Sequence, residues 1–225
     1  MKRLAEEAHQ IALRSQINPH FFFNSLNTIA ALIPDRPQDA ERAVELLAES
    51  LRPVVMRNPP LTSPLGTEVE VAAAYARMEQ LRLGDRFALE FRVDPDARGV
   101  ETPSLFLQPL LENAIAHGVG KRPGRQSVRV EAALAGGRLL VDVRDGSALH
   151  WTEDQRLAAP VPPSPDEHAT ANIAARTRAL FGGDGCVDVR VAPDGAWTRV
   201  VLPVRSAPPA TAQATNGNPL AGVEA

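Results

Sequence analysis

The sequence predicts an α+β fold in which an antiparallel helical hairpin is followed by a two-layer α/β sandwich. Apolar residues recur at helical spacing in the first quarter of the chain and alternate at strand spacing in the second half. The pair Gly136-Gly137 separates two alternating runs, which is typical of a β-hairpin. We therefore expect a hairpin domain at 1–60, a sandwich domain at 61–205 and a disordered tail at 206–225, where little can be buried. Asn58-Pro59-Pro60 and Thr62-Ser63-Pro64 are expected to form a linker between the two domains.

The hairpin is predicted to consist of helices at about 4–33 and 38–57. Between them, Pro34-Asp35-Arg36-Pro37 forms a turn, because proline restricts both itself and the residue before it. A hairpin buries only one seam, so its remaining apolar stripe predicts a homodimer built as a four-helix bundle. The residues expected to face inward are Phe22, Leu26, Ile29 and Ile33 in the first helix, and Ala40, Val44, Leu47 and Leu51 in the second.

The sandwich is predicted to place three helices against an antiparallel or mixed sheet. A capping box formed by Thr67 and Glu70 opens the first of these helices. Thr102-Pro103 opens the second, since proline is tolerated in a first turn. In chain order we expect a helix from Thr67 to Leu83, a strand at 88–93, a helix from Thr102 to His117, strands at 127–134 and 138–144, a helix at 172–181, and strands at 186–191 and 197–204.

Composition excludes several classes of protein. Lys and Arg number 24 against 27 Asp and Glu among 225 residues, without a basic block, so no nucleic-acid partner is expected. The single cysteine, Cys186, excludes an internal disulfide framework and suits a reducing compartment. No apolar run approaches the roughly 20 residues that span a bilayer. We expect no membrane segment in this chain and a cytoplasmic location, either free or at a membrane through regions or partners outside this chain.

The first chemically suggestive stretch is SQINPHFFFNSLN, around His20. Gln16, His20, Asn24 and Asn27 follow one another at steps of four, four and three, so they share a helix face. Pro19 removes a backbone hydrogen bond immediately before the histidine. A neutral imidazole is a competent nucleophile near pH 7. His20 taken alone could be a polar residue on a solvated face, but a proline and flanking amides within a long helix favour a chemical role, with Asn24 beside it.

The second stretch is LQPLLENAIAHG, which ends at Gly118. Asn113 and His117 lie one helical turn apart, and Gln108 and Glu112 form a similar pair beside them. The amide oxygen of Asn113 is a hard ligand suited to Mg²⁺, which bridges nucleotide phosphates. The purely structural alternative is an amphipathic helix that stops at a C-terminal glycine.

Together, these stretches resemble the LytS/YehU-type sensor histidine kinases of bacterial two-component systems. QINPHFFFN is similar to the phosphoacceptor box of that family, and LQPLLENAIAHG is similar to its asparagine-bearing ATP-binding box. AYARMEQLRLGDRF, Ala74 to Phe87, resembles the helix that links them. The resemblance runs from about Ala12 to Arg144, and more weakly to Gly182, and it implies a protein histidine kinase with an ATPase domain of the histidine kinase type.

The resemblance implies that ATP and Mg²⁺ bind the sandwich, that His20 takes the γ-phosphoryl group, and that a response regulator aspartate then receives it. Asn113 would hold Mg²⁺, and Asp145 would accept a hydrogen bond from the adenine amino group. Because Phe21 follows the histidine, no acid lies beside the nucleophile, and our hypothesis is that Glu112 orients or deprotonates it. Further nucleotide-binding residues implied by the resemblance are His117, Gly118, Gly146 and Asn172.

The nucleotide half departs from the family at its glycine boxes. Ser147 and Leu149 stand at glycine positions of the first box, and Glu167 and Ala169 at those of the second. A lysine usual in the asparagine box is Ala116. Because such glycines let backbone amides approach phosphate, their loss predicts weak or lost ATP binding. A non-catalytic dimeric scaffold, or a phosphotransfer module, is therefore the alternative function.

Overall fold

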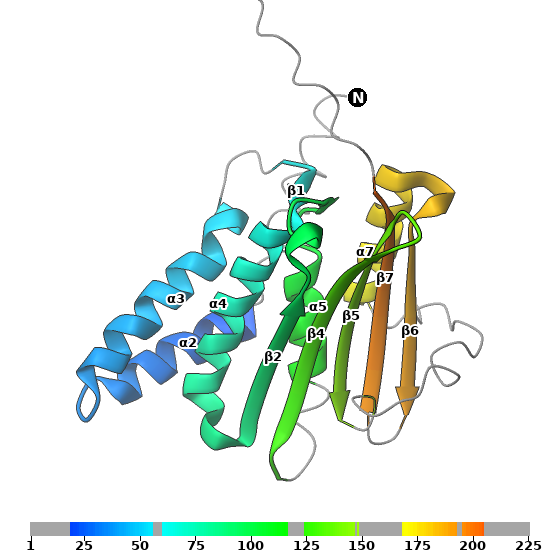
Figure 1. The fold of residues 1–225 in the computed structure, drawn as a ribbon. Coiled ribbons are helices and arrows are strands. Elements are labelled where there is room, and N and C mark those ends of the chain that lie inside the picture. The colour runs from blue at the N-terminus through cyan, green and yellow to red at the C-terminus, as the bar shows by residue number, and fades with distance from the viewer. Residues whose placement is uncertain are drawn as a thin grey trace, which may run out of the picture.

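The protein consists of a helical hairpin packed against one side of a two-layer sandwich (Figure 1). The computed structural model describes residues 19–55, 60–116, 124–146, 148, 168–192 and 195–204. The α+β architecture predicted from the sequence is confirmed.

The α-helices of the described residues are α2 (Pro19–Leu32), α3 (Pro37–Val55), α4 (Leu65–Leu83), α5 (Leu107–Ala114) and α7 (His168–Phe181). Three short 3-10 helices lie between strands and helices: η1 (Gly84–Arg86), η2 (Pro95–Ala97) and η5 (Gly182–Asp184). None of the helices in the described part of the chain is both long enough and apolar enough to cross a membrane.

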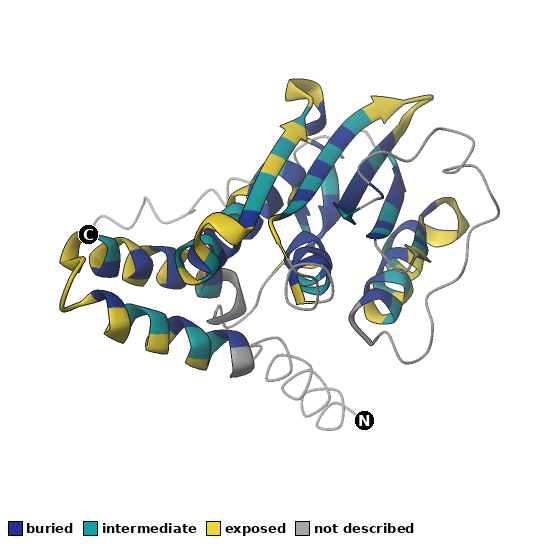
Figure 2. Ribbon diagram, turned by 90° about the horizontal axis from the view of Figure 1, so that it is seen from below, coloured by how far each residue is buried: buried dark blue, intermediate teal, exposed yellow. Residues whose placement is uncertain are grey.

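The strands are β1 (Thr62–Pro64), β2 (Phe87–Val93), β3 (Glu101–Pro103), β4 (Gln126–Ala135), β5 (Arg138–Gly146), β6 (Cys186–Ala192) and β7 (Gly195–Pro203). The main sheet has the order β2-β4-β5-β7-β6, in which only the β2–β4 pair is parallel. Helices α4, α5 and α7 cover one face of this sheet, which forms the predicted sandwich (Figure 2). Gly136 and Gly137 have φ of 56° and 73°, as a two-residue hairpin turn requires, so the predicted β4–β5 hairpin is confirmed.

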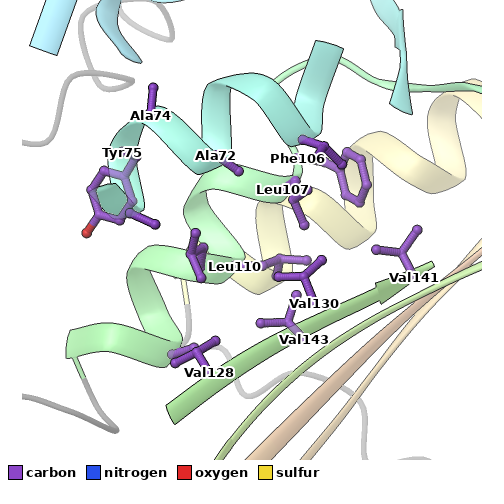
Figure 3. Close-up of a cluster of buried hydrophobic side chains, with 14 of the residues drawn as sticks. Ala72, Ala74, Tyr75, Phe106, Leu107, Leu110, Val128, Val130, Val141 and Val143 are labelled. Carbon is purple, nitrogen blue, oxygen red and sulfur yellow. The ribbon is translucent and has the colours of Figure 1, made fainter. Parts of the chain in front are cut away.

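The core of the sandwich lies between α4, α5 and the inner face of the sheet. Alternate residues of β5, namely Leu139, Val141 and Val143, are buried on this face, and Phe106 and Leu107 meet them from the helical side. Figure 3 shows the part of this cluster where α4, α5 and the central strands meet. The alternation predicted for β5 therefore identifies its core face.

The buried faces of the hairpin agree with the prediction only in part: Ala40 and Leu47 are buried, and Phe22, Ile29 and Leu51 pack against the core. On α2, Phe21 and Ser25 are buried, whereas Leu26 is 42% exposed. On α3, Ala43 is buried, whereas Val44 is 52% exposed. The reason is that both helices pack against α4 as well as against each other, which turns their buried faces toward a third helix.

Two predicted helix starts are wrong. The helix expected from Thr67 begins at Leu65, and both Thr67 and Glu70 are exposed, so no capping box forms. The helix expected from Thr102 begins only at Leu107, because β3 pairs with β1 in register Thr102↔Ser63. The 62–64 stretch, expected to be linker, thus forms a small second sheet.

Candidate active site

His20 occupies the first turn of α2 as the structure describes it, immediately after Pro19. The structure describes the backbone of His20 but not its side chain. The next residue, Phe21, is buried, and its ring lies 4.6 Å from the ring of Tyr75 on α4. The backbone of the predicted phosphoacceptor is therefore held against α4 by its neighbour.

Asn24 lies one turn after His20 on α2 and is half-buried. Its backbone carbonyl accepts a hydrogen bond from the Thr28 hydroxyl at 2.9 Å. Because residues four apart share a helix face, the structure keeps Asn24 on the same side of α2 as residue 20. Its catalytic role stays a prediction.

Asn113 lies near the C-terminal end of α5, where it meets α7. Its side-chain Nδ2 donates a hydrogen bond to the Thr170 hydroxyl at 3.3 Å. With Nδ2 directed at Thr170, the amide presents Oδ1 as a ligand or acceptor. Sequence reasoning missed Thr170, since a threonine in the first turn of a helix carries no signal of its own.

Glu112 lies beside Asn113 on α5 and is half-buried. Its Oε1 accepts a hydrogen bond from Gln108 Nε2 at 3.0 Å, which confirms the expected pairing along one helix face. The carboxylate also acts on the buried Tyr75: burial raises the pKa of the Tyr75 phenol well above its usual value, and the charges of Glu79 and Glu112 raise it further. Glu112 thus lies within electrostatic reach of α4, which contacts the helix that carries His20.

Asp145 is buried near the end of β5, and Gly146 ends that strand with φ of 55°. β5 pairs with the beginning of β4 in register Val128↔Asp145. The last turn of α5 and the end of β5 lie at the same end of the sandwich (Figure 1). The Asn113–Thr170 contact places the beginning of α7 there as well.

Two residues distant in sequence hold α5 at its other end. Glu68 of α4 accepts backbone hydrogen bonds from Leu105 at 2.8 Å and from Phe106 at 3.0 Å. Leu105 has φ of 57°, a left-handed conformation that is uncommon for a residue with a side chain. Arg176 of α7 donates to the Ser104 carbonyl; burial lowers the pKa of its guanidinium, and Glu68 partly offsets this. The loop that starts α5 is thus anchored from two neighbouring helices.

Not every predicted site residue is brought to this end of the sandwich by a described contact. Asn172 is exposed on α7, two residues beyond Thr170, and its nucleotide-binding role stays a prediction. The residues His117, Gly118, Ser147, Leu149 and Glu167, the first predicted helix up to residue 18, and the tail after Val204 lie outside the described residues.

The residues present are compatible with Mg²⁺ and a nucleotide. Mg²⁺ keeps several waters and uses one or two protein oxygens together with substrate phosphates. The Asn113 amide offers one hard oxygen of this kind. Within the described ranges there is no group of three or more His, Cys, Asp or Glu side chains placed to hold a metal ion. The buried Asp145 carboxylate at the same end suits an amine donor.

A helical hairpin that carries His20 in its first described helix packs beside an α/β sandwich, and comparison with known proteins identifies this arrangement as that of a signalling kinase. A family model described as "Histidine kinase" matches residues 8–87. The sensor protein LytS of Enterococcus faecalis is 32% identical over 189 residues, which cover 82% of this chain and 32% of that protein. The sensor histidine kinase YpdA of Escherichia coli is 31% identical over 81% of this chain and 32% of that protein.

Among solved structures, the chain is similar to the histidine kinase domain of the blue-light-activated kinase of Erythrobacter litoralis EL346. The match covers 91% of this chain and 95% of that domain, with a TM-score of 0.45 and 18% identity. The chain belongs to the histidine kinase family, among the LytS/YehU-type sensor kinases. It spans about a third of the length of the curated relatives that it matches.

Proposed function

We propose that the chain is the kinase core of a two-component sensor, in which His20 takes the γ-phosphoryl group of ATP and passes it to an aspartate of a response regulator. The observation that carries the proposal is the Asn113–Thr170 hydrogen bond, which brings α5 and α7 together at the end of the sandwich where β5 also ends. An amide oxygen suited to Mg²⁺ and the buried carboxylate of Asp145 therefore lie at the same end of the fold. The names of the relatives support the same activity.

In the proposed reaction an imidazole nitrogen of His20 attacks the γ-phosphorus of ATP. The N–P bond forms as the bond to the β-phosphate oxygen breaks, and ADP leaves. Mg²⁺, when bound, neutralises charge on the phosphates. Asn113 would supply an oxygen ligand to Mg²⁺, and Asp145 would orient the adenine by accepting a hydrogen bond from its amino group. Glu112 would orient the imidazole or accept its proton. The rate then depends mainly on how closely α2 is held to the nucleotide.

The hairpin supports a homodimer as the working state. Phe23, Leu26 and Ala30 form an exposed stripe along α2 at steps of three and four, and Val44 is exposed on α3. An apolar stripe of this kind needs a partner surface, and a second hairpin supplies one of matching chemistry. In this proposal the hairpin domain comprises residues 1–60, the sandwich domain residues 61–205, and the tail residues 206–225.

The test is incubation with γ-labelled ATP and Mg²⁺. Wild type is expected to take up label that is lost in acid and kept in base, as for phosphohistidine, while His20→Ala takes up none. His9→Ala serves as the matched histidine control and is expected to label normally. Asn113→Asp, which keeps an oxygen ligand, is expected to retain more label than Asn113→Ala. Equal labelling of wild type and His20→Ala would refute the proposed phosphoacceptor.

The alternative is a dimeric scaffold or phosphotransfer module without ATP chemistry. It is favoured by Ser147, Leu149, Glu167 and Ala169, which replace four glycines that would let the backbone approach phosphate. Calorimetric titration with ATP and Mg²⁺ separates the two functions. No heat of binding, together with transfer of phosphate to His20 from a phosphorylated response regulator, would establish the alternative.

A further inference from the structure

Tyr75, the only tyrosine of the chain, lies between the phosphoacceptor helix and the candidate nucleotide site. It belongs to α4 and is 4% exposed. On one side, its ring contacts the ring of Phe21 in a tilted arrangement, with 4.6 Å between centroids and 47° between planes. Phe21 is itself 3% exposed and directly follows His20, so the contact fixes the residue next to the nucleophile.

Two carboxylates lie close enough to Tyr75 for their charges to act on its phenol. Glu79 lies one turn further along α4, is buried, and accepts a hydrogen bond from Arg82 Nε at 3.0 Å. Glu112 belongs to α5, and its charge and that of Glu79 add to burial in raising the pKa of the Tyr75 phenol. Tyr75 therefore lies in the electrostatic field of the residue that precedes Asn113 (Figure 3 shows Tyr75 on α4 beside α5).

This arrangement restricts how α2 can move. Successive residues of an α-helix are about 100° apart, so a rotation of α2 that redirects residue 20 also withdraws Phe21 from Tyr75. Withdrawal exposes two large aromatic surfaces to water, which is unfavourable. The angular position of the nucleophile is thus tied to α4 and, through Tyr75, to α5.

We propose that Tyr75 is a positioning residue that couples helix α2, which carries His20, to helix α5, which carries Asn113. The coupling deepens the proposed function and rests on it. It assigns the positioning of helix α2 during phosphoryl transfer to the aromatic contact between Phe21 and Tyr75. Loss of the contact slows the transfer step and leaves nucleotide affinity unchanged, because the end of α5 keeps its own contacts with α7.

The first experiment compares phosphorylation rates of Tyr75→Leu, Tyr75→Phe and Phe21→Leu with wild type over a range of ATP concentrations up to saturation. Tyr75→Leu and Phe21→Leu are expected to lower kcat by roughly tenfold, as small misplacements of reacting groups do, with KM for ATP unchanged. Tyr75→Phe, which keeps the ring contact, is expected to restore most of the rate. The double variant is expected to be no slower than either single variant, because both remove one contact. Phe23→Leu, at a 62% exposed ring on the same helix, is the control.

The second experiment is independent of phosphorylation. Incorporation of 3-fluorotyrosine labels one position only, so its ¹⁹F resonance reports Tyr75 alone. The resonance is expected to shift in Phe21→Leu and in Glu112→Gln and to stay in place in Phe23→Leu. Circular dichroism melting of each variant excludes unfolding as the cause of a lower rate.

The outcomes separate the two proposals. If wild type takes up no label, the proposed function fails and the positioning role fails with it, while the fluorine shifts still decide whether Tyr75 joins the helices. If wild type is labelled but Tyr75→Leu phosphorylates at the wild-type rate, the positioning role alone is refuted. A rise in KM with unchanged kcat, or a resonance insensitive to Glu112→Gln, also refutes it.

Discussion

The carboxylate of Glu68 caps the first turn of α5 through the backbone N–H of Phe106, at 3.0 Å, although the two residues are 38 positions apart. The same carboxylate accepts the N–H of Leu105 and the hydroxyl of Ser63. A helix start normally relies on a neighbouring serine, threonine, asparagine or aspartate. Here a side chain from α4 replaces it, and the start of α5 depends on tertiary structure.

Glu68→Gln is accordingly expected to lower the free energy of unfolding by about 2–3 kcal/mol, because buried donors lose a charged acceptor. Urea unfolding followed by circular dichroism measures the change. Glu70→Gln, at an exposed position of the same helix, is expected to change it by less than about 0.5 kcal/mol. Equal effects of the two variants would contradict the capping role.

Thr170→Val removes the hydroxyl that accepts the hydrogen bond from Asn113. The amide then loses its fixed orientation, and the affinity for ATP with Mg²⁺ is expected to fall roughly tenfold, as on loss of an outer-shell partner. Calorimetric titration gives this affinity. Arg178→Gln, at an exposed position of α7, is the control and is expected to bind as wild type does. Unchanged affinity in Thr170→Val would remove Thr170 from the site.

Asp142 ties β5 to β7 on the outer face of the sheet. Burial alone raises the pKa of its carboxyl, but hydrogen bonds from Arg199 and Arg144 outweigh burial and hold the pKa below its usual 3.8. The ionised form therefore stabilises the fold at neutral pH, and this contribution is lost as pH falls below 3.8 through the lower folded pKa.

Asp142→Asn is expected to reduce stability by about 3 kcal/mol at pH 7, since two buried arginine contacts lose their charge partner. The difference between wild type and variant should shrink in urea unfolding series as pH falls from 4 toward 2. Glu90→Gln, whose exposed carboxylate also contacts two arginines, should show a much smaller effect. A pH-independent difference would exclude ionisation as its cause.

Gly185 allows the chain to pass closely beside α7 before β6. A Cβ at this position would lie 2.8 Å from Thr177 Cγ2 and 3.0 Å from Phe181 Cβ. Gly185→Ala is expected to destabilise the protein by about 1–3 kcal/mol through overpacking, measured as a lower thermal midpoint. Gly183→Ala, where a Cβ meets no atom within 4 Å, should leave the midpoint nearly unchanged. Equal midpoints for both variants would contradict the steric reason.

The exposed apolar stripe on the hairpin predicts a dimer that charge can disrupt. Leu26→Glu is expected to convert the protein to a monomer at micromolar concentration in light-scattering chromatography, because a charge would be buried without a partner. Leu134→Glu, at a similarly exposed position on β4, is the control and should leave the mass unchanged. A monomeric wild type would refute dimerisation through this face.

Local chemistry made much of the fold predictable. Gly136-Gly137 identified a hairpin because few other residues accept positive φ twice in succession, and alternation identified β5. Thr102 was misassigned because nothing local reveals that its partner is Ser63. The start of α5 was likewise hidden, since its cap, Glu68, belongs to another helix.

The sequence likewise predicted only some residues of the candidate site. Asn113 and Glu112 were found through helical spacing, which depends only on neighbours along the chain. Thr170 was missed because its importance arises from a contact across 57 residues. Tyr75 was passed over within a recognised motif, because burial between two helices is invisible in a single sequence.

The position of α4 also determines where this protein could be recombined with another. Its residues complete the hairpin core on one side, through Tyr75 and Phe21, and the sandwich core on the other, through Leu65 and Ala72. A chimera joined within the apparent linker near residue 60 would therefore combine a foreign hairpin with an α4 surface shaped for the original one. A junction at η1, Gly84–Arg86, would transfer α4 together with the hairpin and keep the contacts of α4 with α2 and α3. The contacts of α4 with α5 would then have to be redesigned. Among the described residues, the unit suited to exchange thus comprises α2, α3 and α4, whereas the position of the proline-rich linker suggests only α2 and α3.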